Sequence, residues 1–392
     1  MKKLLQRIAY KIARRVFVRG FDRFCTVRTG RVLIYNKTEE FLLRGMFQDF
    51  SHTNNWESYE MAKVLNRLGF VVDVIDRTAT LADVAHITDI YDLFIGLGAG
   101  DSGQYFADIA ERVPRAIKVL YAMGPEPDLS NRITKARHDY FRSRHPDMPV
   151  QDRRLILNVD AKRLFAIADS IITIGNEFSV GSYMHLGKDV HKIYLSSYSK
   201  LRLDEEEISK KDKNTFLYFG GNGNITKGLD LVLEAFVERP DLTLYIGAPA
   251  GEEDFNAFAD PLIARSPNIH RLGFVDVTSK EYWNLTAKCG YVIMPSSSEG
   301  CATSVTTCMR RGLIPIVTIE SGVEDVETFG FLTPGTVEGV QATVDAVSRI
   351  SKEEFLDRVT KTYQQSNLYT QEHFSETFSQ AITDILTTHH AK

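Results

Sequence analysis

The chain of 392 residues is longer than one hydrophobic core ordinarily supports, so its length predicts two domains of roughly 150 to 200 residues. A hydrophobic content of 43% and a charged content of 25% are those of an average globular protein. The net charge of −4 argues against a nucleic-acid-binding protein, because such a protein needs a basic surface to neutralise phosphates.

The first 31 residues carry ten Lys or Arg and a single acid, Asp22. In "MKKLLQRIAYKIARRVFVRGF" the apolar residues, including Val16 and Phe17, recur at helical spacing, and the basic residues take the other side. The pattern over 1–21, within a basic amphipathic segment of residues 1–30, predicts a helix that lies on an anionic membrane surface. The alternative is a helix that packs on its own domain and leaves its charges in water. No run of 18 apolar residues occurs, so we expect a soluble or peripheral protein and no membrane-spanning helix.

Residues 31–198 alternate short, nearly continuous apolar runs with helical patterns, which is the signature of a parallel sheet covered by helices. The predicted strands are 31–36, 70–76, 91–98, 116–123, 169–175 and 190–196, with a helix near 55–68. The charged segment 199–214 then predicts an exposed linker between domains.

The alternation restarts over 215–366 and predicts a second domain of the same α/β class. Its expected strands are 215–221, 242–249, 269–275, 291–297 and 314–319. The final segment, 367–392, has one apolar helical face, which packs either within the second domain or against the first. Two doubly wound, Rossmann-like domains in series form a cleft at the carboxyl ends of their strands, where ligands bind.

The stretch "GGNGNITKGLDLVLEAF" (220–236) lies at such an edge. Glycines between Gly220 and Gly223 allow close approach of the backbone, and Lys227 comes just before a helix. Backbone N–H groups, a helix amino terminus and an ammonium together suit a phosphate. Most glycine-rich turns only connect a strand to a helix, so this motif is weak by itself.

The second informative stretch is "PSSSEGCATSVTTCMRRGLIPIV" (295–317), in which a strand ends in a serine-rich loop with Glu299, and a short helix follows from about Ser304. A carboxylate at this place accepts hydrogen bonds from sugar hydroxyls, and the neighbouring backbone amides donate hydrogen bonds to a phosphate. Read alone, Glu299 is an ordinary loop carboxylate in water.

Taken together, the two stretches resemble the donor-binding half of GT-B glycosyltransferases, in particular the retaining family called GT4. Residues 227–236 look like that family's "KG…LI-x-A" segment, and "PSSSEG" looks like its "PS-x-x-EG". The resemblance implies that Lys227 binds the donor diphosphate, that Glu299 contacts the nucleotide sugar, and that both act in catalysis. By the same resemblance the donor site includes Gly221, Asn222, Ser298, Gly300, Cys301, Ala302, Thr303 and Thr307.

Three departures from the family leave alternatives open. Asn222 stands where the family has an arginine, Thr307 stands where it has a second glutamate, and 121–131 lacks its histidine. Altered donor choice, a slow enzyme and a catalytically weakened GT-B partner subunit at the membrane therefore all remain. A nicotinamide-dependent enzyme is the generic alternative, although the first strand-to-helix turn of each domain lacks the dinucleotide fingerprint.

The first domain is expected to bind the acceptor. Asn54 and Glu57 have the spacing of a capping pair, which predicts that His52, Thr53 and Asn54 face the cleft at a helix amino terminus. His52 is the candidate catalytic residue of this domain, in contact with the sugar or acceptor. The basic run 131–154 either holds an acidic acceptor or is a helix with its charges in water.

The predicted reaction is metal-independent, cofactor-free transfer from a nucleotide sugar to a carbohydrate or lipid-linked acceptor, in cell-surface polysaccharide or glycoconjugate synthesis. The chain has no Asp-x-Asp, and its four cysteines (25, 289, 301 and 308) have neither CxxC spacing nor a suitably placed histidine. We therefore expect no metal site, and free thiols in a reducing, cytoplasmic compartment. Retention of anomeric configuration is implied by the resemblance.

Overall fold

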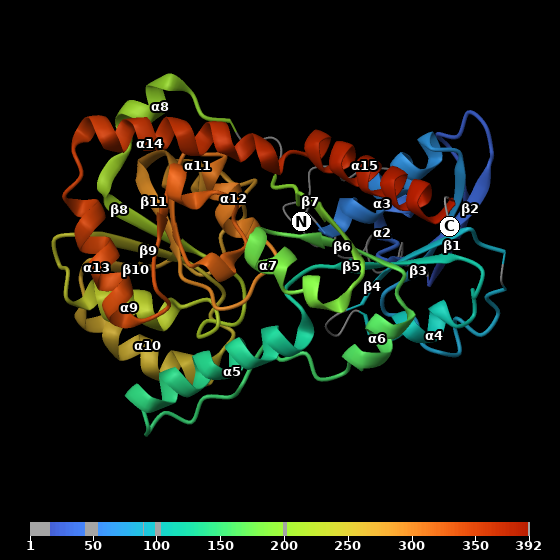
Figure 1. The fold of residues 1–392 in the computed structure, drawn as a ribbon. Helices are drawn as coiled ribbons and strands as arrows, with labels where there is room; N and C mark the ends of the chain where they lie inside the picture. Colours follow the sequence, from blue (N-terminus) through green and yellow to red (C-terminus); the bar gives the residue numbers. More distant parts are fainter. Residues whose placement is uncertain (1–15, 44–53, 89, 99–102, 199–201, 391–392) are drawn as a thin grey trace.

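The computed structural model describes residues 16–43, 54–88, 90–98, 103–198 and 202–390. Figure 1 shows two α/β lobes side by side, with helix α14 over the second lobe and the last helix, α15, over the first. The predicted α/β class with two Rossmann-like domains is confirmed.

The first sheet has the strand order β1-β3-β2-β4-β5-β6-β7, and all neighbours are parallel except β1, which pairs antiparallel with β3. The central strands are buried along their length, as the apolar runs predicted. The strands are β1 (Phe17–Phe21), β2 (Gly30–Asn36), β3 (Phe70–Asp76), β4 (Leu93–Leu97), β5 (Ile117–Ala122), β6 (Ser170–Ile174) and β7 (Asp189–Ile193).

Strand β1 corrects the sequence analysis, which placed residues up to 21 in an amphipathic helix. Phe17 pairs with Ile75 on the edge of the sheet, and a bulge between Val18 and Phe21 bends the strand. The backbone N–H of Gly20, at φ 66°, donates to Asp73 Oδ1 at 2.6 Å. A free edge and β-prone side chains outweigh the helical spacing here. Residues 1–15, which carry the rest of the predicted membrane helix, lie outside the described residues.

The helices of the first domain are α2 (Glu39–Leu43), α3 (Asn54–Arg67), α4 (Phe106–Ala110), α5 (Pro127–Arg144), α6 (Ala161–Ile167) and α7 (Glu177–Gly181). Helix α5 begins with Pro127 at its first turn, and the Glu126 carboxylate accepts the N–H groups of Asp128 and Leu129. This helix runs below the second domain (Figure 1).

The predicted linker 199–214 is not an open connection. It contains helix α8 (Glu205–Lys210), and strand β8 already begins at Asp212. Glu207 forms an ion pair with the buried Arg311 at 2.7 Å, and the buried Lys211 donates to the carbonyls of Thr286 and Cys289. The charges that suggested exposure are therefore used to dock this segment onto the second domain.

The second sheet has the order β10-β9-β8-β11-β12-β13 and is parallel throughout. Its strands are β8 (Asp212–Phe219), β9 (Thr243–Gly247), β10 (Ile269–Arg271), β11 (Cys289–Met294), β12 (Ile314–Val317) and β13 (Phe331–Leu332). Its helices are α9 (Leu229–Val237), α10 (Glu253–Arg265), α11 (Lys280–Lys288), α12 (Thr303–Met309), α13 (Val337–Ser348) and α14 (Lys352–Gln365). The chain order reverses between β8 and β11, where ligands bind in such sheets.

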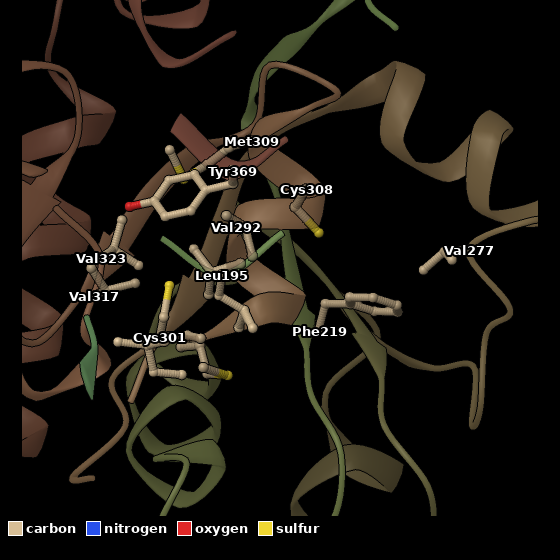
Figure 2. Close-up of a cluster of buried hydrophobic side chains, with 14 of the residues drawn as sticks. Leu195, Phe219, Val277, Val292, Cys301, Cys308, Met309, Val317, Val323 and Tyr369 are labelled. Carbon is tan, nitrogen blue, oxygen red and sulfur yellow. The ribbon is translucent and has the colours of Figure 1, made fainter. Parts of the chain in front are cut away.

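The last helix, α15 (Gln371–His390), crosses back and packs on β7 and α3 of the first domain. The ring of Phe374 contacts Trp56 edge-on at 5.3 Å. Figure 2 shows Leu195, just after β7, in the same buried cluster as Tyr369 and Cys301, so the apolar core is continuous across the domain boundary. Among the described residues, no helix is long and apolar enough to span a bilayer.

Candidate functional site

The two predicted donor motifs meet because strands β8 and β11 are neighbours in the second sheet and end at the same edge. The carbonyl of Thr226 accepts the Ser297 N–H at 2.7 Å, the Ser297 hydroxyl at 3.1 Å and the Ser296 hydroxyl at 3.3 Å. Gly228, at φ 75°, lies so close to Pro295 that a Cβ there would be 2.4 Å from the proline carbonyl oxygen. The two loops therefore form one unit.

Lys227 and Glu299 form an ion pair at the centre of this unit, between Nζ and Oε1. The Ser296 hydroxyl also donates to Oε1, at 3.2 Å. Only 8% of the lysine side chain and 12% of the glutamate side chain are exposed. The sequence analysis placed these residues at two ends of one ligand, and the structure brings them into direct contact.

Burial and neighbouring charges shift the pKa of both members of this pair. Burial raises the pKa of Glu299, but the positive charges of Arg154 and Lys227 outweigh that effect and hold the pKa at about 2. Burial lowers the pKa of Lys227, and Arg154 adds to this decrease, while Glu299 opposes it. A ligand that binds one member of the ion pair in place of the other must therefore balance the charge of the displaced member.

Glu252 is a member of the site that the sequence analysis missed. It follows β9, next to β8 in the sheet, and its carboxylate accepts the N–H of Gly223 and, at 3.2 Å, that of Asn224. These two amides were expected to be available to a phosphate, and here a carboxylate takes that place. An acid just after the strand beside the glycine-rich turn was the available signal.

Arg154 is the second residue that was missed, and it comes from the first domain. Its Nη2 lies 3.4 Å from Glu299 Oε2, and 40% of its side chain is exposed. A Cβ on Gly223 would lie 2.4 Å from Arg154 Cδ, so the arginine passes directly over the glycine-rich turn. Asn222, which stands where the family has an arginine, is exposed. The cation over this turn is supplied by a different part of the chain.

The basic run that includes α5 neither faces water as a whole nor forms a free cationic surface. Arg137 is buried against Asp230 of α9, and Arg144 also contacts Asp230, at 2.6 Å. The pair between Arg153 and Asp254 at 2.6 Å continues this seam. Several of its cations hold the two domains together, which corrects the interpretation of the run as a helix with its charges in water, and contact with an acidic acceptor stays a prediction. A groove of about 230 Å³ remains between α5 and the loops after β11 and β12.

The other predicted donor residues differ in their exposure and in the element that they belong to. Gly221 is exposed, whereas Cys301, Ala302 and Thr307 are buried. Thr303 begins α12.

Two members of the serine-rich loop contact the first domain. Ser298 hydrogen-bonds Ser130 of α5 at 2.8 Å. A Cβ on Gly300 would lie 2.2 Å from the carbonyl oxygen of Met123, so the loop is packed tightly against that domain.

The predicted acceptor residues lie at the start of α3 and just before it. His52 and Thr53 lie outside the described residues, and Asn54 is the first residue of α3, with its side chain outside the described part. Glu57, its proposed capping partner, is buried.

Comparison with known proteins agrees with this geometry. Residues 202–367 match the family Glycosyl transferases group 1. The match contains both donor motifs and ends before α15. No curated protein matches the chain.

Solved structures extend the likeness to both domains. Anabaena Alr3699/HepE in complex with UDP and glucose is 15% identical, with a TM-score of 0.59 over 92% of this chain and 100% of that one. Sucrose-phosphate synthase from Thermosynechococcus elongatus is 12% identical, with a TM-score of 0.64 and the same coverage. A glycosyltransferase from Rickettsia africae is 13% identical, with a TM-score of 0.58 over 92% and 99% of the two chains. The predicted GT-B resemblance is confirmed.

Proposed function

We propose that this chain transfers a glycosyl unit from a nucleotide-sugar donor to a carbohydrate or lipid-linked acceptor, with retention of configuration. The observation that carries the proposal is the buried Lys227–Glu299 pair where β8 and β11 end, within the region that matches group 1 glycosyl transferases. Structural neighbours in complex with UDP and glucose and with UDP-glucose support a nucleotide-sugar donor.

In the proposed reaction, the bond between the anomeric carbon and the diphosphate breaks, and a new bond forms from that carbon to an acceptor oxygen. The diphosphate leaves with additional negative charge, which the ammonium of Lys227 stabilises in a largely water-excluded position. The acceptor proton passes to the departing phosphate. Glu299 accepts hydrogen bonds from hydroxyl groups of the bound sugar, because its low pKa keeps the carboxylate ionised.

The test has two stages. A thermal-shift panel of UDP-, GDP-, ADP- and CDP-sugars identifies the donor, because a ligand that binds the folded state raises the melting temperature. NMR of the product then gives the anomeric configuration. Donor consumption without and with acceptor distinguishes an enzyme from a non-catalytic GT-B subunit, and repetition in chelator tests the predicted metal independence. Donor binding with no turnover on any acceptor would favour the subunit.

A further inference from the structure

Arg154 has an unusual backbone conformation and a specific place. Its φ is 64°, in the left-handed region that non-glycine residues seldom occupy, and its side chain crosses the glycine-rich turn at Gly223. Gly223 has φ 93°, and a Cβ at this residue would lie 2.4 Å from Arg154 Cδ, so a glycine here leaves room for the arginine side chain. An unfavourable backbone conformation that the surroundings maintain is often found at functional sites.

The segment around Arg154 is fixed on both sides. Before it, the Gln151 N–H donates to Asp254 Oδ2 at 2.8 Å, and Arg153 makes a two-pronged pair with the same carboxylate. After it, Ile156 and Asn131 exchange hydrogen bonds of 2.7 and 2.9 Å. Arg154 therefore extends from a held segment, while its partly exposed guanidinium can still reach a ligand.

The balance of charges at the donor site indicates a function for Arg154. A nucleoside diphosphate brings roughly two to three negative charges, and Lys227 alone supplies one positive charge, which Glu299 already balances. A guanidinium binds phosphate oxygens in a two-pronged geometry that an ammonium cannot adopt. Arg154 contacts the other oxygen of the same glutamate, Oε2, at 3.4 Å. A diphosphate next to Lys227 would therefore lie between two cations.

We infer that Arg154 binds the donor diphosphate from the first domain, opposite Lys227 of the second. The inference rests on the proposed function. Residue 154 belongs to the connection between β5 and β6, whereas 227 follows β8. The two cations therefore come from different domains, and donor binding depends on the domains being held together.

The experiment compares Arg154→Ala and Arg154→Lys with wild type by calorimetry. The probe is the tightest binder to wild type among UDP, GDP, ADP, CDP and dTDP, together with its monophosphate. Arg154→Ala should weaken diphosphate binding about tenfold to a hundredfold, with a smaller effect on the monophosphate. Arg154→Lys should restore part of the loss. Lys135→Ala, which removes an exposed cation paired with Asp139 on α5, should leave both affinities unchanged.

Unchanged diphosphate affinity in folded Arg154→Ala would overturn the inference while leaving the proposed function intact. Tighter binding would also overturn it, because Arg154 would then be a group that the donor must displace. A wild type that binds none of the five diphosphates would overturn the proposed function and this inference together. If Arg154→Ala unfolds, Arg154→Lys decides, because it keeps the charge and loses the two-pronged geometry.

Discussion

Lys227 is the residue whose removal should affect chemistry most. Lys227→Ala removes a charge that matters as the diphosphate departs, so we expect kcat and kcat/KM to fall by about 10². It also leaves the buried Glu299 without its ion-pair partner. Steady-state kinetics with the identified donor measures the effect, and Lys361→Ala, which removes an exposed lysine of α14, is the matched control. Near-normal kcat/KM in folded Lys227→Ala would contradict the proposed role.

Substitution of Glu299 should change the steady-state kinetics in a different way from substitution of Lys227. Glu299→Gln keeps the shape of the side chain but removes the negative charge that pairs with Lys227. It also weakens the hydrogen bonds that this side chain accepts from sugar hydroxyls. We expect a higher donor KM in addition to a lower kcat. Kinetics over a range of donor concentrations separates the two parameters, and a change in kcat alone would argue against contact between Glu299 and the ground-state sugar.

Glu57, in the first turn of α3, predicts a pH dependence of stability. Burial raises its pKa from 4.5 to about 7, although the charge of Lys37 opposes the shift. In the unfolded chain the carboxyl ionises near its ordinary pKa, so the folded state loses stability as pH rises from about 4.5 to 7. The full effect is at most about 3 kcal/mol.

Glu57→Gln cannot ionise, so its free energy of unfolding relative to wild type should increase over that window and level off above about pH 7. Urea unfolding of both proteins at several pH values between 4.5 and 8 measures this difference. A difference that stays constant with pH would show that the buried carboxyl does not titrate in this way.

Helix α15 is the element that joins the end of the chain to the first domain. Phe374 is fully buried and contacts Trp56, so Phe374→Ala should lower the free energy of unfolding by about 3–5 kcal/mol. Glu376→Ala, on the exposed side of the same helix, should change it by less than about 0.5 kcal/mol. Chemical denaturation compares them. Equal stabilities of the two variants would mean that the packing of α15 on the first domain contributes little to the free energy of unfolding.

Three segments of the first domain show why some elements were predicted correctly from the sequence and others were not. Strand β3 and helix α3 depend on local apolar patterns, and both lie within about one residue of the prediction. Strand β1 was predicted wrongly, because its partner is an edge of the sheet formed more than 50 residues later. Helical spacing in a short segment carries no information about whether a free edge is available.

The two domains are joined by ion pairs between α5 and α9. Asp230 is fully buried and accepts both Arg137 and Arg144, so Asp230→Asn removes the charged partner of the buried Arg137 and one of the two carboxylates that contact Arg144. We expect a loss of about 3–5 kcal/mol in unfolding free energy, because removing one member of a buried pair leaves uncompensated charge. Small-angle scattering should also show a larger radius of gyration as the domains separate.

The matched control is Asp241→Asn, which removes an exposed carboxylate paired with Arg239 and should cost at most about 1 kcal/mol. If Asp230→Asn changes neither stability nor dimensions, the seam does not hold the domains together.

The sequence alone determined the two-domain α/β fold and most strand positions, and the roles proposed for Lys227 and Glu299 came from the resemblance of two short motifs to a known family. These features follow from local apolar periodicity and from two short motifs, and neighbouring strands bring the motifs together whenever the sheet forms. Only the tertiary structure revealed Arg154 and Glu252 at the same turn. Their positions depend on how one loop from each domain lies over Gly223, and no spacing along the chain records that contact.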